Sequence, residues 1–210
     1  MSKKLFSLFL CLALLSVGLF AEWIPVHRDA ADGSAPQIKV LASDNFHSIV
    51  EVTLPGFYRH EDRDSRLWKI ALPEGALTEE IGKSALPTLS GILAVPGDVE
   101  SVQLSHIDIL SSHEFKGFQA YPFQKPTTDD ESEGAFVKDE EHYASNELYP
   151  SACVQVEPVS VWRNLKVVLF RMTPIQARPA SGALIAHGRV TFTLQRSEEH
   201  TSELQSRQSI

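Results

Sequence analysis

The chain has 210 residues, 43% of them hydrophobic, so it is long enough to bury a core of its own. Aspartates and glutamates number 27 against 19 lysines and arginines, which gives a formal net charge of −8. This acidic balance, without a basic patch, argues against nucleic acid as a partner. The sequence contains neither a zinc-binding spacing nor a phosphate-binding loop, and no cofactor is expected.

The N-terminus has the pattern of a secretory signal peptide. Lys3 and Lys4 precede an apolar run over residues 5–20, which is short for a membrane span and is followed by the small residue Ala21. We therefore predict that residues 1–21 are a signal peptide and that the protein is exported to the periplasm, the cell surface or the medium. After cleavage no membrane association is expected; an uncleaved anchor is the alternative. Cys153 is then the one cysteine left, which excludes an intrachain disulfide.

Short apolar runs bounded by proline or glycine follow along the chain, and each is predicted to be a strand. In the run 47–54, Val50, Val52 and Leu54 lie on one face, as in a half-buried antiparallel strand. This arrangement favours an all-β fold, a two-sheet antiparallel β-sandwich. The predicted strands of the first half cover residues 37–41, 47–54, 67–72, 88–95 and 99–110.

Irregular features are expected at three places in this half. The apolar phase of the run 99–110 changes between Leu104 and Ile107, which predicts a β-bulge near Ser105 and His106. The charged run 58–66 is predicted to be a solvated loop. Residues 78–82 are predicted to form a short helical turn.

The composition changes between residues 129 and 147, where Lys138 is the one basic residue among eight acidic ones. We predict a long acidic loop, because the first half of this segment has no apolar residues to bury. In its second half, Phe136, Val137, Tyr143 and Leu148 can dock back on the domain. The carboxylates leave calcium binding open, although the alternating Asp-Gly pattern of a calcium loop is missing. The acidic residues are Asp129, Asp130, Glu131, Glu133, Asp139, Glu140, Glu141 and Glu147.

The most regular stretch covers residues 164–194. Both faces of the run 165–172 are apolar, which predicts a strand in the centre of its sheet. Pro174, Pro179 and Gly182 indicate a structured connection over residues 173–183. A second strand follows, with its apolar residues at even positions from Leu184 onward, and Gly188 is predicted to mark a bulge or a close backbone approach.

The C-terminal residues 196–210 have no apolar period and follow abruptly after the last predicted strand. The run RSEEHTSELQS, which begins at Arg196, matches the translation of a common sequencing adapter residue for residue. We therefore predict that the domain covers residues 22–195 and that residues 196–210 are an artefactual tail, with the natural protein continuing past Gln195. A genuine polar tail is the alternative.

The end of the predicted domain also resembles a known family. An apolar strand, the run TPIQARPASGAL from Thr173 and a strand of the type RVTFTL are similar to the end of the propeptide of gingipain-type cysteine peptidases. Further short motifs occur in the order of that family and extend the resemblance over residues 23–194. They are Trp23 with Pro25, LPGF at 54–57, GKSALP at 82–87, AVP at 94–96 and YP at 149–150.

This resemblance implies a prodomain without catalysis of its own. Such a domain would pack on the cysteine peptidase domain expected after Gln195, assist its folding as an intramolecular chaperone, and keep the zymogen inactive until cleavage. It also implies that a loop of the prodomain enters the active-site cleft like a substrate, often with a basic residue in the specificity pocket.

Lys138 is the candidate for that inhibitory residue. It is flanked by Asp139, Glu140 and Glu141, and acidic neighbours would suit a cleft that attracts basic side chains. The alternative is that Lys138 only contributes to solubility. The rival basic residues are Lys116, Lys125 and Arg178.

Two other functions stay open on the sequence. A free-standing adhesion or carbohydrate-binding β-domain would expose an aromatic cluster, for which the candidates are Trp68, Phe118, Tyr121 and Trp162. An autonomous hydrolase would need a nucleophile beside a base. Cys153 lies in a strand-like run, and no histidine has a suggestive local context, so a buried structural cysteine is expected.

Overall fold

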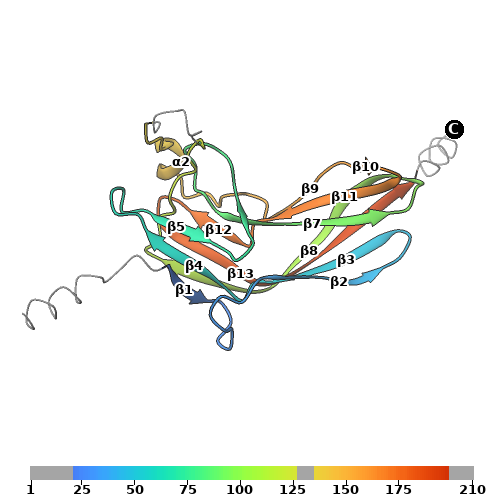
Figure 1. The fold of residues 1–210 in the computed structure, drawn as a ribbon, viewed down its shortest axis with the longest axis horizontal. Helices are drawn as coiled ribbons and strands as arrows, with labels where there is room; N and C mark the ends of the chain where they lie inside the picture. The colour runs from blue at the N-terminus through green and yellow to red at the C-terminus, as the bar shows by residue number, and fades with distance from the viewer. Residues whose placement is uncertain (1–20, 127–134, 199–210) are drawn as a thin grey trace, which may run out of the picture.

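A computed structural model describes residues 21–126 and 135–198 of the chain. The predicted signal peptide lies outside this part, apart from Ala21, as do residues 199–210 and the first four acidic residues of the acidic segment. Every pair of named strands in the described part is antiparallel, which confirms the predicted all-β antiparallel fold. Two large sheets face each other as a β-sandwich (Figure 1).

The first large sheet is built around β13 (Ala183–Glu198). Its strand order is β12-β13-β3-β2, and β8 pairs with β13 along the other edge. β13 therefore has neighbours on both sides over most of its length. Its even-numbered residues are apolar because that face of the strand is buried in the core. The other strands are β2 (Gln37–Ser43), β3 (His47–Thr53), β8 (Val99–Lys116) and β12 (Ile175–Arg178).

The second large sheet is built around β11 (Leu165–Met172). β11 lies between β7 on one side and β10 and β9 on the other, which confirms the predicted central strand. A smaller third sheet has the order β1-β4-β5. The remaining strands are β1 (Glu22–Pro25), β4 (Gly56–Glu61), β5 (Trp68–Ala71), β6 (Ala76–Leu77), β7 (Pro87–Val95), β9 (Val154–Val156) and β10 (Ser160–Trp162).

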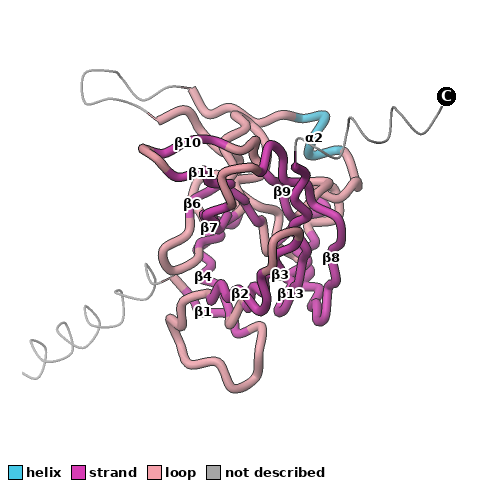
Figure 2. Tube along the Cα trace, turned by 90° about the vertical axis from the view of Figure 1, so that its right-hand side faces the viewer, coloured by secondary structure: helices cyan, strands magenta, loops and turns pink. Residues whose placement is uncertain are grey.

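One hydrophobic core joins the sheets. Its residues come from all three sheets. Figure 2, the view turned by 90°, shows the backbone of the strands arranged around the interior of the molecule. Phe57, Phe170 and Phe192 are fully buried, and the last two meet edge to face with ring centroids 5.1 Å apart. Burying a side chain of this kind contributes about 1.5–3 kcal/mol, so the core is the main source of the fold's stability.

Two predicted irregularities are confirmed. In the pairing of β8 with β13, Thr193 is opposite His106 and Leu194 is opposite Leu104, so Ser105 is the extra residue of a bulge. The register also shifts at Gly188, where a β-carbon would lie 2.8 Å from the Ser111 hydroxyl oxygen. Gly188 therefore combines a bulge with a close approach.

Two predictions for connections hold only in part. The first half of the charged run 58–66 is not a loop but belongs to β4, which pairs with β1 and β5. Its charge is compatible with a strand because Arg59 forms an ion pair with Glu22 at 2.6 Å. The turn predicted for residues 78–82 forms only at its end, where the Lys83 N–H donates to Glu80 O at 3.1 Å. Thr78 is held extended by hydrogen bonds from its backbone N–H to Leu86 O (2.8 Å) and from Leu86 N–H to its hydroxyl (3.0 Å).

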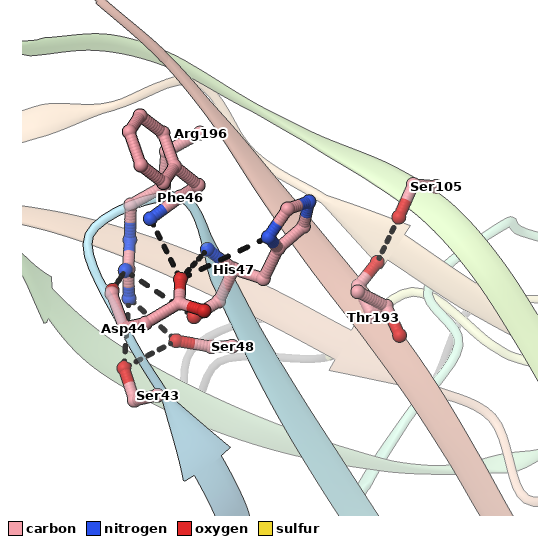
Figure 3. Close-up of polar contacts among 8 residues, drawn as sticks. All are labelled: Ser43, Asp44, Phe46, His47, Ser48, Ser105, Thr193 and Arg196. Atoms are coloured by element: carbon pink, nitrogen blue, oxygen red, sulfur yellow. Dashed lines mark hydrogen bonds and ion pairs between the residues drawn. The ribbon is translucent and has the colours of Figure 1, made fainter.

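β13 extends past the predicted domain boundary at Gln195, and Arg196 is buried. The Arg196 guanidinium donates hydrogen bonds to Asp44 O and Ser48 Oγ, while its backbone N–H donates to Phe46 O at 2.7 Å. These contacts join the end of β13 to the turn between β2 and β3 (Figure 3). The adapter origin of residues 196–210 concerns the gene and stays a prediction.

Candidate functional site

The segment that carries Lys138 leads into the short helix α2 (Glu140–Ala144), at the end of the molecule away from β10 (Figure 1). The Lys138 side chain is 26% exposed, and its Nζ lies 3.3 Å from Glu140 Oε2. The same ammonium group lies 4.8 Å from the centroid of the Tyr143 ring. Because Glu140 is largely exposed, such an ion pair contributes at most about 1 kcal/mol. The ammonium group therefore contacts α2, but moving it away from the helix would cost little free energy.

Both neighbours of Lys138 in the chain are fixed to the domain. The backbone N–H of Val137 donates to Gln124 Oε1, and Gln124 Nε2 donates to Val137 O, both at 2.8 Å. On the other side, the Asp139 N–H donates to Gly82 O at 3.0 Å. The backbone around Lys138 is thus held from two sides, while its side chain is partly buried against α2.

The three predicted acidic neighbours lie together but play different parts. Asp139 is the N-cap of α2, and its Oδ1 accepts a hydrogen bond from the His142 N–H at 3.0 Å. Glu140 and Glu141 occupy the first turn, where negative charge is favoured by the helix dipole. Glu140 also pairs with Lys138, whereas Glu141 is exposed.

The other side of α2 is docked on the domain through His142 and Tyr143. Tyr143 is buried, and its hydroxyl donates to Ala120 O at 2.6 Å. Burial raises the pKa of Tyr143 to about 12, so the hydroxyl stays protonated. His142 Nε2 accepts a hydrogen bond from the Ser84 N–H at 3.2 Å and lies 3.0 Å from the Ser84 hydroxyl. Burial lowers the pKa of His142 and favours the neutral ring that this contact requires.

A polar depression lies beside α2, between Glu80, Lys83 and Tyr149. Glu80 accepts hydrogen bonds from Lys83 Nζ at 2.6 Å and from the Tyr149 hydroxyl at 3.0 Å. The Lys83 hydrogen bond holds the pKa of Glu80 below its usual range, so the carboxylate stays ionised. Glu80, Lys83 and Tyr149 thus pair with one another, which is typical of a structural cluster.

The rival basic residues are arranged differently. Lys116 is 81% exposed at the end of β8, with Nζ 3.8 Å from Glu114 Oε1. Arg178 donates to Asn146 O at 3.1 Å. Lys125 is exposed and follows Gln124 directly. Within residues 21–126 and 135–198, Lys116 and Lys125 lack two backbone anchors of the kind seen beside Lys138. Arg178 has them, because Ala177 exchanges backbone hydrogen bonds with Tyr149 and Pro179 O accepts from Gln119 Nε2 at 3.0 Å.

The alternative functions find less support in the described residues. Trp68 and Phe118 contact each other with centroids 5.3 Å apart, but Trp162 lies on β10 in another sheet, so the four aromatic residues form no single cluster. Cys153 is buried in the core, as predicted, and burial raises the pKa of its thiol. Residues 21–126 and 135–198 contain no group of three side chains suited to a metal ion, and no helix long and apolar enough to cross a membrane.

Gln124, Gly82, Ser84 and His142 were not predicted from the sequence. Ser84 and His142 are 58 positions apart, and no local pattern links them. One signal was available: an aspartate followed by two glutamates is typical of a helix start, and it marks Asp139 as the N-cap.

One family model matches most of the chain, and two solved structures share its fold. The family model Propeptide_C25 matches residues 28–210. A structure of gingipain K from Porphyromonas gingivalis, described for its zymogenic latency, superposes with a TM-score of 0.68 at 14% identity, covering 85% of this chain and 100% of the other. The complex of the RgpB pro- and mature domains from the same organism gives a TM-score of 0.65 at 17% identity, with coverage of 84% and 97%.

At these identities the structural likeness shows the fold alone. A search of curated proteins found no match. The family model, in contrast, matches residues 28–210, which is well over half of the sequence. The chain therefore belongs to the Propeptide_C25 family, the non-catalytic propeptides of gingipain-type cysteine peptidase precursors.

Proposed function

We propose that this domain keeps the peptidase of its own precursor inactive by placing the segment around Lys138 in the active-site cleft. It acts as a zymogen inhibitor and as an intramolecular chaperone for the peptidase domain. The family supports this role, as do the two similar structures, one described for zymogenic latency and the other as a complex of pro- and mature domains.

The anchoring of Lys138 is the observation that carries the proposal. A segment bound like a substrate must present an extended backbone with one side chain free to enter a pocket. Val137 and Asp139 are both tied to the domain, whereas the contacts of the Lys138 side chain among the described residues are its pair with the exposed Glu140 and the Tyr143 ring. Preorganisation of this kind lowers the entropy lost on binding.

The charge of Lys138 itself fits such a partner. A cleft that accepts basic side chains carries negative potential, which attracts the Lys138 ammonium group, whereas Asp139, Glu140 and Glu141 have the same sign as the cleft. Complementary charge mainly raises the association rate and the specificity. The contribution of the Lys138 ammonium group should therefore weaken at high salt, because surface charges are screened within about 8 Å at physiological ionic strength.

The test is inhibition of the peptidase domain encoded after this region in the uninterrupted gene. Wild type is compared with Lys138→Ala and with the two rival lysines, Lys125→Ala and Lys116→Ala. Lys116 also has a glutamate as its ionic partner, so its variant reports what the loss of such a pair costs by itself. Lys138→Ala should weaken binding more than about tenfold, or about 1.4 kcal/mol, and the other two variants should bind like wild type.

Equal binding by wild type and Lys138→Ala would remove Lys138 from this role. Loss of binding in Lys125→Ala alone would transfer the role to that residue. A gene without a peptidase domain at this position would overturn the prodomain function itself and favour the adhesion-type module. The chaperone role predicts a higher refolding yield of the peptidase domain when the propeptide is present.

The proposal includes export through a signal peptide over residues 1–21, to the periplasm, the cell surface or the medium. The charged start and short apolar run support it. Mass spectrometry of the protein recovered outside the cytoplasm should give an N-terminus at Glu22, or one or two positions away. An N-terminus at Met1 would contradict cleavage.

A further inference from the structure

The carboxamide of Gln124 binds the backbone of Val137 as a peptide group would in an antiparallel sheet. It accepts from the Val137 N–H and donates to the Val137 carbonyl, both at 2.8 Å, across 13 positions of sequence. Its second N–H donates to Pro122 O at 3.0 Å. Both donors of the amide and its acceptor oxygen are therefore used.

The backbone next to Gln124 is itself paired as in an antiparallel sheet. Phe123 exchanges backbone hydrogen bonds with the facing segment, donating to Lys83 O and accepting from the Gly82 N–H, both at 2.8 Å. Gly82 O in turn accepts from the Asp139 N–H at 3.0 Å. The residues on either side of Lys138 are thus bound to two segments that pair with each other. Val137 is bound by Gln124, and Asp139 is bound by Gly82.

We infer that Gln124 is a positioning residue for Lys138, which holds the backbone at Val137 so that the lysine is presented in a fixed, extended segment. This inference rests on the proposed inhibitory function and goes beyond it by naming the group that prepares the segment for the cleft. An extended segment held before binding loses less conformational freedom on docking than a loose one. The gain should appear as slower dissociation.

The chemistry at this position requires a glutamine. Glutamate has nearly the same shape but has no N–H, so it would lose both donated bonds and place a negative charge beside the carbonyls of Val137 and Pro122. Gln124→Glu is therefore the sharpest variant. Gln119 provides a matched control, since it is also partly buried and donates through Nε2 to a proline carbonyl, Pro179 O, at 3.0 Å.

The experiment compares wild type, Gln124→Glu, Gln119→Glu, Lys138→Ala and the double variant Gln124→Glu/Lys138→Ala. The inhibition constant and the dissociation rate are measured against the peptidase domain from the same gene. Hydrogen exchange of the Val137 amide and the unfolding temperature are measured on the free proteins. These two readouts separate a local effect on the segment from a general loss of stability.

Gln124→Glu should raise the inhibition constant and the dissociation rate about tenfold and speed exchange at Val137, with an unfolding temperature like that of Gln119→Glu. In the double variant the two losses should not add, because Gln124 acts through Lys138. Wild-type inhibition by Gln124→Glu, or losses that add fully in the double variant, would overturn the positioning role.

The same measurements distinguish a failure of the proposed inhibitory function from a failure of the positioning role of Gln124. If wild type does not inhibit, or if Lys138→Ala inhibits as well as wild type, the inhibitory assignment of Lys138 falls and the positioning role falls with it. If Lys138→Ala is impaired and Gln124→Glu is not, only the role of Gln124 is overturned.

Discussion

The ring of Phe170 on β11 occupies the space beside Gly91 on β7, its direct partner across the two strands. Phe170 is fully buried and also meets Phe192 of the facing sheet. A β-carbon on residue 91 would overlap the Phe170 ring, so Gly91→Ala should force the ring away from its core position. We expect a loss of about 1–3 kcal/mol in the free energy of unfolding, as for other overpacked cores, measured by urea denaturation.

Gly97→Ala is the control for this substitution. A β-carbon at residue 97 meets nothing within 4 Å, so this variant should unfold within about 0.5 kcal/mol of wild type. Equal stability of Gly91→Ala and Gly97→Ala would mean that the core adjusts at Phe170 without cost.

Arg196 is expected to stabilise the turn between β2 and β3 (Figure 3). Its guanidinium donates to Ser43 Oγ at 3.1 Å as well as to Asp44 O and Ser48 Oγ. Arg196→Ala should lower the free energy of unfolding by about 1–3 kcal/mol, because the buried Ser48 hydroxyl loses its donor and the partly buried contacts to Ser43 and Asp44 are lost as well. Arg196→Lys should recover only part of this loss, since an ammonium group lacks the planar fork of the guanidinium.

Arg189→Ala is the matched control, because Arg189 lies on the same strand but is exposed. Thermal unfolding of the three variants beside wild type measures the effect. If Arg196→Ala is as stable as Arg189→Ala, the buried contacts of residue 196 contribute nothing to the fold.

The fold could be predicted from the sequence where a strand shows its own period. Val50, Val52 and Leu54 alternate with less buried residues, and this pattern predicts β3 without any knowledge of its partners. β4 was missed because its charges are paired across strands. Arg59 lies opposite Glu22, 37 positions away, and sequence composition does not show that contact.

The candidate site shows the same limit. Composition locates the acidic segment and isolates Lys138, because both are local properties of the chain. The contacts that hold the segment, from Gln124 to Val137 and from Ser84 to His142, join residues that only the tertiary structure brings together. The inhibitory role of Lys138 therefore depends on the family resemblance and stays a prediction.

A pH dependence of stability is expected from His187. It is buried on β13, with Nε2 2.6 Å from Gln176 Oε1, and Nδ1 has no hydrogen-bond partner in the described residues. Burial lowers the pKa of His187 below the value of about 6.5 for a free imidazole. Between the folded and unfolded pKa values the unfolded chain binds more protons, so this contribution to stability is complete above pH about 6.5 and is lost as the pH falls through the folded pKa.

Urea denaturation between pH 7.5 and pH 5 (roughly the range over which histidine titrates) checks this expectation. His187→Phe should be less stable at neutral pH, since Gln176 loses its partner, but its stability should change less with pH. Some slope should remain from His142, whose pKa burial also lowers. A wild-type slope in His187→Phe would contradict the assignment.

Asp62 should stabilise the turn that follows β4. Its carboxylate accepts hydrogen bonds from Lys69 Nζ at 2.8 Å and from the Ser65 hydroxyl at 2.8 Å, and these contacts lower the pKa of Asp62 to about 2. An unfolded aspartate has a pKa of about 3.9, so the contribution is complete above that pH and is lost as the pH falls toward 2.

Asp62→Asn should therefore lower the free energy of unfolding at pH 7 by about 1 kcal/mol, a value reduced for solvent screening because the side chain is partly exposed. The difference from wild type should shrink as the pH approaches the folded pKa, because the wild-type carboxyl then also becomes neutral. Asp64→Asn, in the same turn but exposed, should show no such convergence. Urea denaturation of all three proteins at neutral and acid pH decides the point: a constant gap for Asp62→Asn would mean that the carboxylate charge contributes nothing.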